Sequence, residues 1–269
     1  MTAPIGPMPA PYPPVWASGW GTDRLSPYPF VELELAEGVV TVLRWIPPGR
    51  FLMGSPNDEP GRWEDEGPQH WVTLTKGYWL ADAPCTQAEW KAVMGTTPSH
   101  FKGPDRPVEQ VSWEECQQYC EKLRARFPAV PARLPSEAEW EYACRAGTTT
   151  AFNDGSACTQ PEGNDPALAK LGWFDKNSGG ETHPVRKLAP NQLGLYDMHG
   201  NVWEWCQDWF GNYVAEEQVD PAGAGEGRER VLRGGSWGLR ALYCRSAFRN
   251  GGRPSLRFPD LGFRLASGQ

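Results

Sequence analysis

Two stretches in the C-terminal half of the chain bear most directly on its fold: residues 194–205, GLYDMHGNVWEW, and residues 230–237, RVLRGGSW. Both combine glycine turns with short aromatic or aliphatic runs, which is typical of short strands bounded by loops. The whole chain shares this character, because its 269 residues include 14 tryptophans, 30 glycines and 27 prolines. Many large rings among many turn residues favour a loop-rich fold in which aromatic side chains anchor the loops.

Upstream of these stretches, three helices are expected. The first spans roughly Thr86 to Met94. The second and third begin after Ser112 and Ser136, and each serine is followed three residues later by a glutamate, which is the pattern of a capping box. Gly147 is a natural residue to follow the end of the third helix.

The N-terminal half reads mainly as strands. Residues 30–44 predict two strands around a Glu-Gly turn, and residues 45–55 and 70–81 predict further strands, separated by an acidic loop at 56–70. Residues 1–29 are rich in proline and predict an extended arm that lies on a body formed by residues 30–269. Residues 151–192 are dominated by turn residues, and so long a loop is usually functional or held by a metal.

Five blocks in order carry a family resemblance: GRFLMGS (49–55), RLPSEAEWEYACRAG (133–147), GLYDMHGNVWEW (194–205), RVLRGGSW (230–237) and GFRLA (262–266). Their order and spacing resemble the formylglycine-generating-enzyme, or sulfatase-modifying factor, family. The resemblance covers roughly residues 38–266. It implies an α+β fold of the C-type lectin type, loop-rich, with short strands and a few helices. Because one fold hosts several functions, the site must decide between them.

The catalytic cysteine pair of that family is incomplete here. The resemblance places two cysteines, separated by four residues, after the GGS motif, where two thiolates bind Cu(I) and oxygen is activated. Cys244 matches the second cysteine, but Leu239 stands where the first is expected. A hydrocarbon cannot bind copper, so we expect Cys244 to be a small buried residue.

Other chemistries find no better support. Only four histidines occur, and none forms an H-x₃-H pair; His199 is expected to be satisfied by backbone groups in a turn. There is no G-x-S-x-G elbow and no P-loop. The acidic clusters at Glu64–Glu66 and Glu114–Glu115 resemble solvated faces or helix caps. No catalytic residue is therefore assigned.

The segment that follows GGS has a second resemblance, to the variable region of diversity-generating-retroelement proteins. In those proteins asparagine AAY codons are rewritten at their adenines while framework codons stay fixed. The resemblance makes residues 237–260 a variable region and a ligand-binding surface. Its predicted binding residues are Trp237, Gly238, Leu239, Arg240, Leu242, Tyr243, Phe248, Gly251, Gly252, Arg253, Ser255, Leu256, Phe258 and Asp260.

The genetic code offers a check on this interpretation. An AAY codon changed only at its adenines cannot encode Met, Trp, Lys, Glu or Gln, and none of these occurs in residues 238–265. They make up 57 of the 269 residues, so about six would be expected in these 28 positions, although a fixed framework lowers that expectation. Arg240, Arg253, Tyr243 and Phe248 are of types common at binding hot spots. The alternative is that Leu242, Tyr243 and Phe248 belong to the core.

The resemblance also implies structural calcium near the GNVWEW block. Asn201 and Glu204 could supply side-chain oxygens, and Asn164, Asp165 and Asp175 are further loop donors. The same residue types equally often satisfy turns. Tryptophans 203, 205, 209 and 237 can stack on ligands, but in these framework blocks they are expected to anchor the loops.

The remaining expectations concern partners and compartment. A net charge of −7 argues against nucleic acid as the main partner. No apolar run is long enough to span a membrane, and the N-terminus lacks the features of a secretory signal, so a cytoplasmic protein with seven mostly reduced cysteines is expected. The sequence favours a non-catalytic protein that binds a protein ligand. The alternatives are an oxidoreductase or other enzyme of the same fold with a non-standard site, and a scaffold domain.

Overall fold

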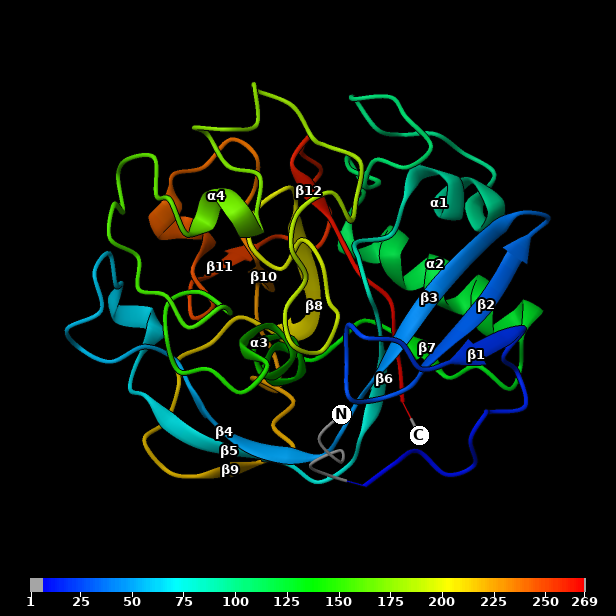
Figure 1. Ribbon diagram of the computed structural model, residues 1–269, viewed down its shortest axis with the longest axis horizontal. Coiled ribbons are helices and arrows are strands. Elements are labelled where there is room, and N and C mark those ends of the chain that lie inside the picture. The colour runs from blue at the N-terminus through cyan, green and yellow to red at the C-terminus, as the bar shows by residue number, and fades with distance from the viewer. Residues whose placement is uncertain (1–6, 269) are drawn as a thin grey trace.

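The computed structural model describes residues 7–268, which form three sheets and a small number of helices (Figure 1). The first six residues of the predicted arm and Gln269 lie outside the described residues. The strands are β1 (Gly19–Gly21), β2 (Phe30–Ala36), β3 (Val39–Ile46), β4 (Gly49–Met53), β5 (His70–Leu74), β6 (Tyr78–Ala81), β7 (Ala132–Arg133), β8 (Trp203–Trp209), β9 (Gln218–Val219), β10 (Arg230–Arg233), β11 (Arg249–Gly252), β12 (Leu261–Gly262) and β13 (Ala266–Ser267).

The largest sheet has the strand order β1-β2-β3-β6-β13-β7. Its central hairpin, β2 and β3, turns at Glu37 and Gly38, where Gly38 has a φ of 73°, as the Glu-Gly turn predicted. The N-terminal arm does more than lie on the body, because β1 pairs antiparallel with β2 and extends the sheet. The rings of Tyr12 and Trp16 also pack against Trp79.

The three predicted helices are α1 (Gln87–Met94), α2 (Trp113–Arg126) and α3 (Glu137–Arg145). All three begin with a complete capping box, in which a Ser or Thr hydroxyl accepts from the third helical N–H. Helix α3 differs from the prediction at its end, because Ala146, the residue before Gly147, already has a left-handed φ of 47°.

Two smaller sheets lie beside the largest one. One has the order β11-β10-β8-β12 and carries the two blocks of the C-terminal half; the other has the order β4-β5-β9. Strand β10 lies between β8 and β11, both antiparallel to it, so it fixes the position of the segment that begins at residue 237. In Figure 1 this sheet lies at the centre, and β4, β5 and β9 run along the lower left edge.

The long segment 151–192 is irregular, as predicted, apart from the short helix α4 (Leu168–Leu171). The structure supplies a reason for its order that needs no metal. Phe152, Leu168 and Phe174 form a small hydrophobic cluster of their own, which also includes Cys244. Asp165 is fully buried and accepts hydrogen bonds from four backbone N–H groups, among them those of Thr159 and Leu168. Backbone capping lowers the pKa of this carboxylate although burial opposes it.

The mixture of short strands and few helices is an α+β fold, as predicted. Within residues 7–268, no helix combines the length and apolar content that crossing a bilayer requires.

Candidate binding surface

The predicted binding residues lie on one continuous segment that leaves β10, passes through the 3-10 helix η2 (Ala241–Cys244) and β11, and ends in the loop before β12. The structure divides them into three groups. Gly238, Arg240, Arg253, Ser255 and Phe258 are exposed; Trp237, Leu239, Tyr243, Gly251, Leu256 and Asp260 are partly exposed; Leu242, Phe248 and Gly252 are buried. We call the first two groups, other than Asp260, the display surface.

The three buried positions correct the sequence-based prediction. Phe248 is 2% exposed, with its ring against those of Trp63 and Trp203. Leu242 is 4% exposed, and it packs so closely on Gly61 that a Cβ added to that glycine would lie 2.8 Å from the Leu242 Cβ. At Gly252 an added Cβ would come within 2.9 Å of the Trp205 ring. Leu242 and Phe248 fill space between the display surface and the core, and Gly252 leaves room for the Trp205 ring.

Asp260 also turns inward. Its carboxylate accepts a hydrogen bond from the Ser236 hydroxyl at 2.8 Å, and its backbone carbonyl accepts one from the Trp203 N–H at 2.8 Å. Burial raises the pKa of this carboxyl group. Asp260 therefore fixes the end of the loop and contributes little to a surface.

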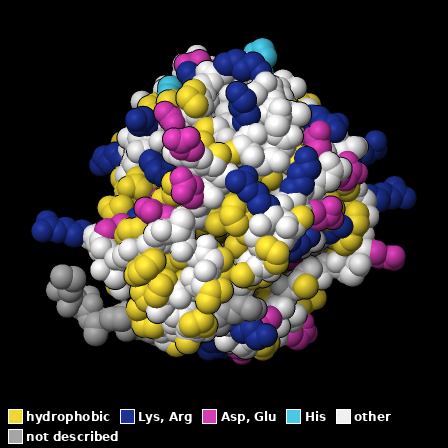
Figure 2. Space-filling view, turned by 90° about the vertical axis from the view of Figure 1, so that its right-hand side faces the viewer, with side chains coloured by type: hydrophobic (Ala, Val, Ile, Leu, Met, Phe, Trp, Pro, Cys, Tyr) yellow, Lys and Arg dark blue, Asp and Glu magenta, His cyan; other side chains and the backbone are white. Residues whose placement is uncertain are grey.

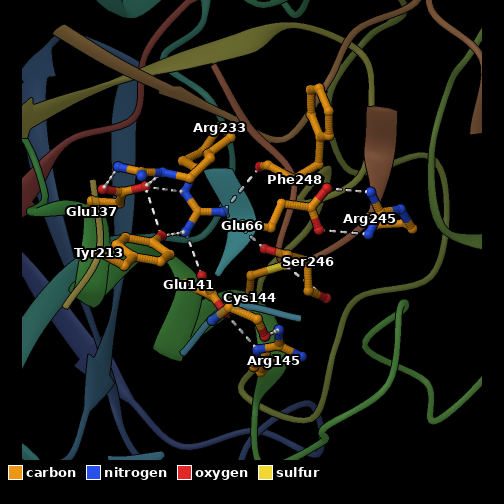
Figure 3. Close-up of polar contacts among 12 residues, drawn as sticks. Glu66, Glu137, Glu141, Cys144, Arg145, Tyr213, Arg233, Arg245, Ser246 and Phe248 are labelled. Atoms are coloured by element: carbon orange, nitrogen blue, oxygen red, sulfur yellow. Dashed lines mark hydrogen bonds and ion pairs between the residues drawn. The ribbon is translucent and has the colours of Figure 1, made fainter. Parts of the chain in front are cut away.

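A network of buried arginines holds the segment in place (Figure 3). Arg245 donates five hydrogen bonds, to both oxygens of Glu66, to Glu59 and to the carbonyls of Gly61 and Leu242. Its side chain is fully buried, as is that of Glu66. Of the two alternatives predicted for Glu64–Glu66, a solvated face is wrong for Glu66, whose carboxylate neutralises a buried guanidinium. The other alternative, a helix cap, is correct for it, because Glu66 accepts from the Trp63 backbone N–H.

Two more arginines of the network connect the segment to α3. Arg249 makes a two-pronged pair with Glu137, with both nitrogen–oxygen distances at 2.7 Å. Arg233 pairs with Glu141 and donates to the carbonyls of Ser246 and Phe248. Arg233, Arg245 and Arg249 thus serve the interior and are not available to a ligand at the surface.

Sequence reasoning missed one residue of this region. Trp63, from the loop between β4 and β5, is 49% exposed, and its ring lies edge-on to those of Tyr243 and Phe248 at centroid distances of 5.9 and 5.7 Å. Its backbone N–H donates to Glu66, which itself binds Arg245. Trp63 lies in an acidic loop far in sequence from residues 237–260, and only its residue type could have indicated a place at a binding surface.

At the two positions of the family's catalytic cysteine pair, this chain has a leucine and a buried cysteine. Leu239 is partly exposed, whereas Cys244 is fully buried, as expected from its sequence context. Burial raises the pKa of the Cys244 thiol far above its ordinary value, so it stays protonated at neutral pH. The residues present do not fit a copper ion, because a linear two-sulfur site needs two thiolates and this position offers none.

His199 behaves as its turn context predicted. Its Nδ1 lies 2.7 Å from the Cys244 carbonyl, and its Nε2 accepts from the Asn153 backbone N–H at 3.2 Å. Burial lowers the pKa of this imidazole to about 4, so the ring is neutral at physiological pH. Both ring nitrogens are used by backbone groups, and neither is available for a ligand.

The two expected calcium donors of the GNVWEW block, Asn201 and Glu204, already have protein partners. Glu204 binds Arg264 through both carboxylate oxygens at 2.7 Å and also accepts from the Trp140 indole N–H at 2.7 Å. The Asn201 side chain bonds the backbone of His183 and the carboxylate of Asp197. Three of the roughly four acceptor sites of the Glu204 carboxylate are therefore used by Arg264 and Trp140. Within residues 7–268, no group of three His, Cys, Asp or Glu side chains is arranged to hold a metal.

The framework tryptophans act as anchors, as predicted. Trp205 is buried and donates to the Val111 carbonyl at 3.0 Å. Trp237 donates to the Pro259 carbonyl at 3.1 Å, which closes the loop of the display surface. Trp209 packs under the guanidinium of Arg230 at 3.4 Å.

The model of the sulfatase-modifying factor enzyme 1-like domain matches residues 35–268, nearly the whole chain. This chain belongs to the sulfatase-modifying factor family. Among curated members, the formylglycine-generating enzyme of Bos taurus is 36% identical over 199 residues, which are 71% of this chain and 50% of that protein. That of Streptomyces coelicolor is 39% identical and covers 67% of this chain and 58% of its own length. The chain thus spans about half the length of these relatives.

Two solved structures share the fold of this family member over most of its length. Treponema denticola variable protein 1 is 33% identical, with a TM-score of 0.74, and covers 86% of this chain and 96% of its own. PvdO from Pseudomonas aeruginosa is 28% identical, with a TM-score of 0.75, and covers 88% and 98%. These similarities confirm the predicted family and its C-type-lectin-like fold, and they include a variable protein as well as relatives named as enzymes.

Proposed function

We propose that this member of the sulfatase-modifying factor family is a non-catalytic binding protein. It presents the display surface to a protein ligand. The observation that carries the proposal is the state of the family's reactive position, where Leu239 replaces a thiol and Cys244 is sealed in a small hydrophobic cluster. The similarity to Treponema denticola variable protein 1 supports the same function.

The exposure pattern supports a surface whose residues can change without loss of the fold. The display positions Arg240, Arg253, Ser255 and Phe258 are exposed, while the interspersed residues Arg245 and Arg249 are buried in ion pairs. Separation of this kind lets the exposed side chains vary, because buried ion pairs, together with the packing of Phe248 and the hydrogen bonds of Trp237 and Asp260, fix the backbone beneath them. The rings of Trp63 and Tyr243 add rigid aromatic area beside the variable positions.

A genomic comparison tests the diversification. We expect a near-copy of the coding segment for residues 237–261, differing at template adenines, beside a gene for a reverse transcriptase. A complete genome that encodes this chain without such a copy would refute diversification, although not the binding role.

A stability measurement tests the division between display and framework residues. A variant with alanine at Arg240, Arg253, Ser255 and Phe258 is expected to keep its free energy of unfolding in urea within about 2 kcal/mol of the natural chain, since each exposed substitution usually costs no more than about 0.5 kcal/mol. Unfolding of this variant under native conditions would contradict the proposed division between display and framework.

The alternative function is an enzyme of the same fold, an oxidoreductase or another, that uses Cys244; the enzymes among its relatives favour it. Oxidation of a cysteine-containing peptide in the presence of added Cu(I) is the direct assay. We expect no turnover, because a protonated, buried thiol is neither a copper ligand nor a nucleophile. Turnover that disappears in Cys244→Ala would establish the enzyme instead.

A further inference from the structure

A groove lies on the outer face of the largest sheet and shares no residue with the display surface. It is shallow and open to solvent, with a volume of about 440 Å³. Its walls come from the N-terminal arm, the β2–β3 hairpin, the residue after β6 and the loop before β8. The lining residues are Asp23, Leu25, Phe30, Glu32, Val40, Val42, Arg44, Asp82, Arg186 and Tyr196. We call this the sheet groove.

Strand alternation explains why these side chains share one face. In the antiparallel register of β2 and β3, Phe30 lies opposite Arg44 and Glu32 lies opposite Val42. Successive side chains of a strand point to opposite faces, so the intervening residues, such as Leu43, point into the core. The hairpin therefore buries one face and leaves the other as the floor of the groove.

Two ion pairs form the polar end of the groove. Arg44 is buried and binds Asp23 of the arm through both terminal nitrogens, at 3.2 and 2.7 Å. Asp82 is buried too, and its Oδ1 accepts from both Nε and Nη2 of Arg186. Tyr196 lines the groove in the electrostatic field of both pairs.

These pairs leave particular atoms unused. Within residues 7–268, no hydrogen bond occupies Asp82 Oδ2, Arg186 Nη1 or the Tyr196 hydroxyl, and none of the three is sealed from solvent. The groove thus offers a negatively charged acceptor and a positively charged donor that belong to one ion pair. A ligand that carries an ammonium and a carboxylate close together, as an α-amino acid does, would satisfy both through charge-assisted hydrogen bonds.

The rest of the lining is mainly apolar. Leu25, Val40 and Val42 contribute to it beside the carboxylate of Glu32, and Leu25 and Val40 are each 38% exposed. Figure 2 shows the face at the right of Figure 1, where apolar side chains gather in the lower half, the region of the N-terminal arm. The apolar residues favour contact with an aliphatic or aromatic side chain, and Glu32 disfavours an acidic one.

We propose that the sheet groove binds an apolar α-amino acid, with its ammonium at Asp82, its carboxylate at Arg186 and its side chain against Leu25, Val40 and Val42. The Tyr196 hydroxyl completes the contacts to the charged groups. The N-terminal arm is part of the site, because it contributes both Asp23 and Leu25.

The test is a titration of the full, isotope-labelled chain with L-leucine, followed by two-dimensional amide NMR. We expect saturable shifts at β2, β3 and residues 186–196, with a dissociation constant of about 1 mM or lower. N-acetyl-L-leucine lacks the ammonium and L-leucine amide lacks the carboxylate, so each is expected to bind about tenfold more weakly. These analogues test the site without altering the protein.

Two variants locate the site. Tyr196→Phe keeps the ring and removes the hydroxyl, and it is expected to weaken L-leucine binding about threefold to tenfold. Phe258→Ala, on the display surface, is expected to leave it unchanged. Absence of saturable shifts up to about 50 mM L-leucine, equal binding of the three ligands, or shifts confined to residues 237–260 would each overturn the proposal. No residue of the sheet groove lies in residues 237–260. Failure of the amino-acid proposal would therefore leave the proposed binding function of the display surface untouched. Failure of that function would likewise leave the amino-acid proposal untouched.

Discussion

Arg245 offers a decisive test of the buried ion network beneath the display surface. Its side chain is fully buried, and replacing it with methionine would leave the Glu66 and Glu59 carboxylates without their cationic partner. Breaking a buried pair in this way costs about 3–5 kcal/mol, because an uncompensated carboxylate stays in the interior. We therefore expect Arg245→Met to lose about that much of the free energy of unfolding.

Arg240 provides a matched control on the same segment. It pairs with Glu162, but the two side chains are 57% and 62% exposed, and exposed pairs contribute about 0–1 kcal/mol. Urea unfolding followed by tryptophan fluorescence measures both variants, and equal slopes with urea would show that only stability has changed. If Arg245→Met costs less than about 1 kcal/mol, or no more than Arg240→Met, the account of the network is refuted.

Three further predictions follow from burial. Phe248→Ala should cost about 3–5 kcal/mol in urea unfolding and Phe258→Ala less than about 1, and a reversed order would contradict the division between framework and display. Burial and the neighbouring Glu137 raise the pKa of Asp208 to about 7 in the folded chain. Protonation of Asp208 therefore stabilises the folded state. This stabilisation is complete below the pKa of the unfolded chain and is lost as the pH rises towards 7. Asp208→Asn should therefore gain stability relative to the natural chain between pH 5 and pH 8, and a pH-independent difference in urea midpoints would count against it. All seven cysteines, Cys244 included, are buried and free, so a thiol reagent should label them only after denaturation; rapid labelling of the native protein would show that the thiols are accessible.

Local signals in the sequence predicted the elements well. The capping boxes at Ser112 and Ser136 marked the helix starts, and the Glu-Gly turn marked the hairpin, because these patterns depend on residues within four positions of one another. The N-terminal arm was harder, since the pairing of β1 with β2 is a contact between distant residues that proline-rich composition does not reveal.

For the display surface, the sequence located the segment but not its exposed members. Tyr243 and Phe248 are both aromatic residues of types found at binding sites, yet one reaches the surface and the other is buried. Both rings pack against Trp63, nearly two hundred residues away in sequence, and Phe248 is also packed against Trp203. Contacts of this kind cannot be obtained from residue type or spacing.

The sequence by itself determined the family, the incomplete cysteine pair and the C-terminal segment, because all three reside in the identity and order of residues. Tertiary structure alone decided which arginines are interior. Arg245 and Glu66 are separated by 179 positions, and only the fold brings them together and removes both from water. It also decided the fate of Glu204, whose carboxylate resembles a metal ligand in the sequence but faces Arg264 in the folded chain. Burial and charge pairing are properties of the packed interior, where the cost of an unpaired charge dictates the neighbours that a residue must have.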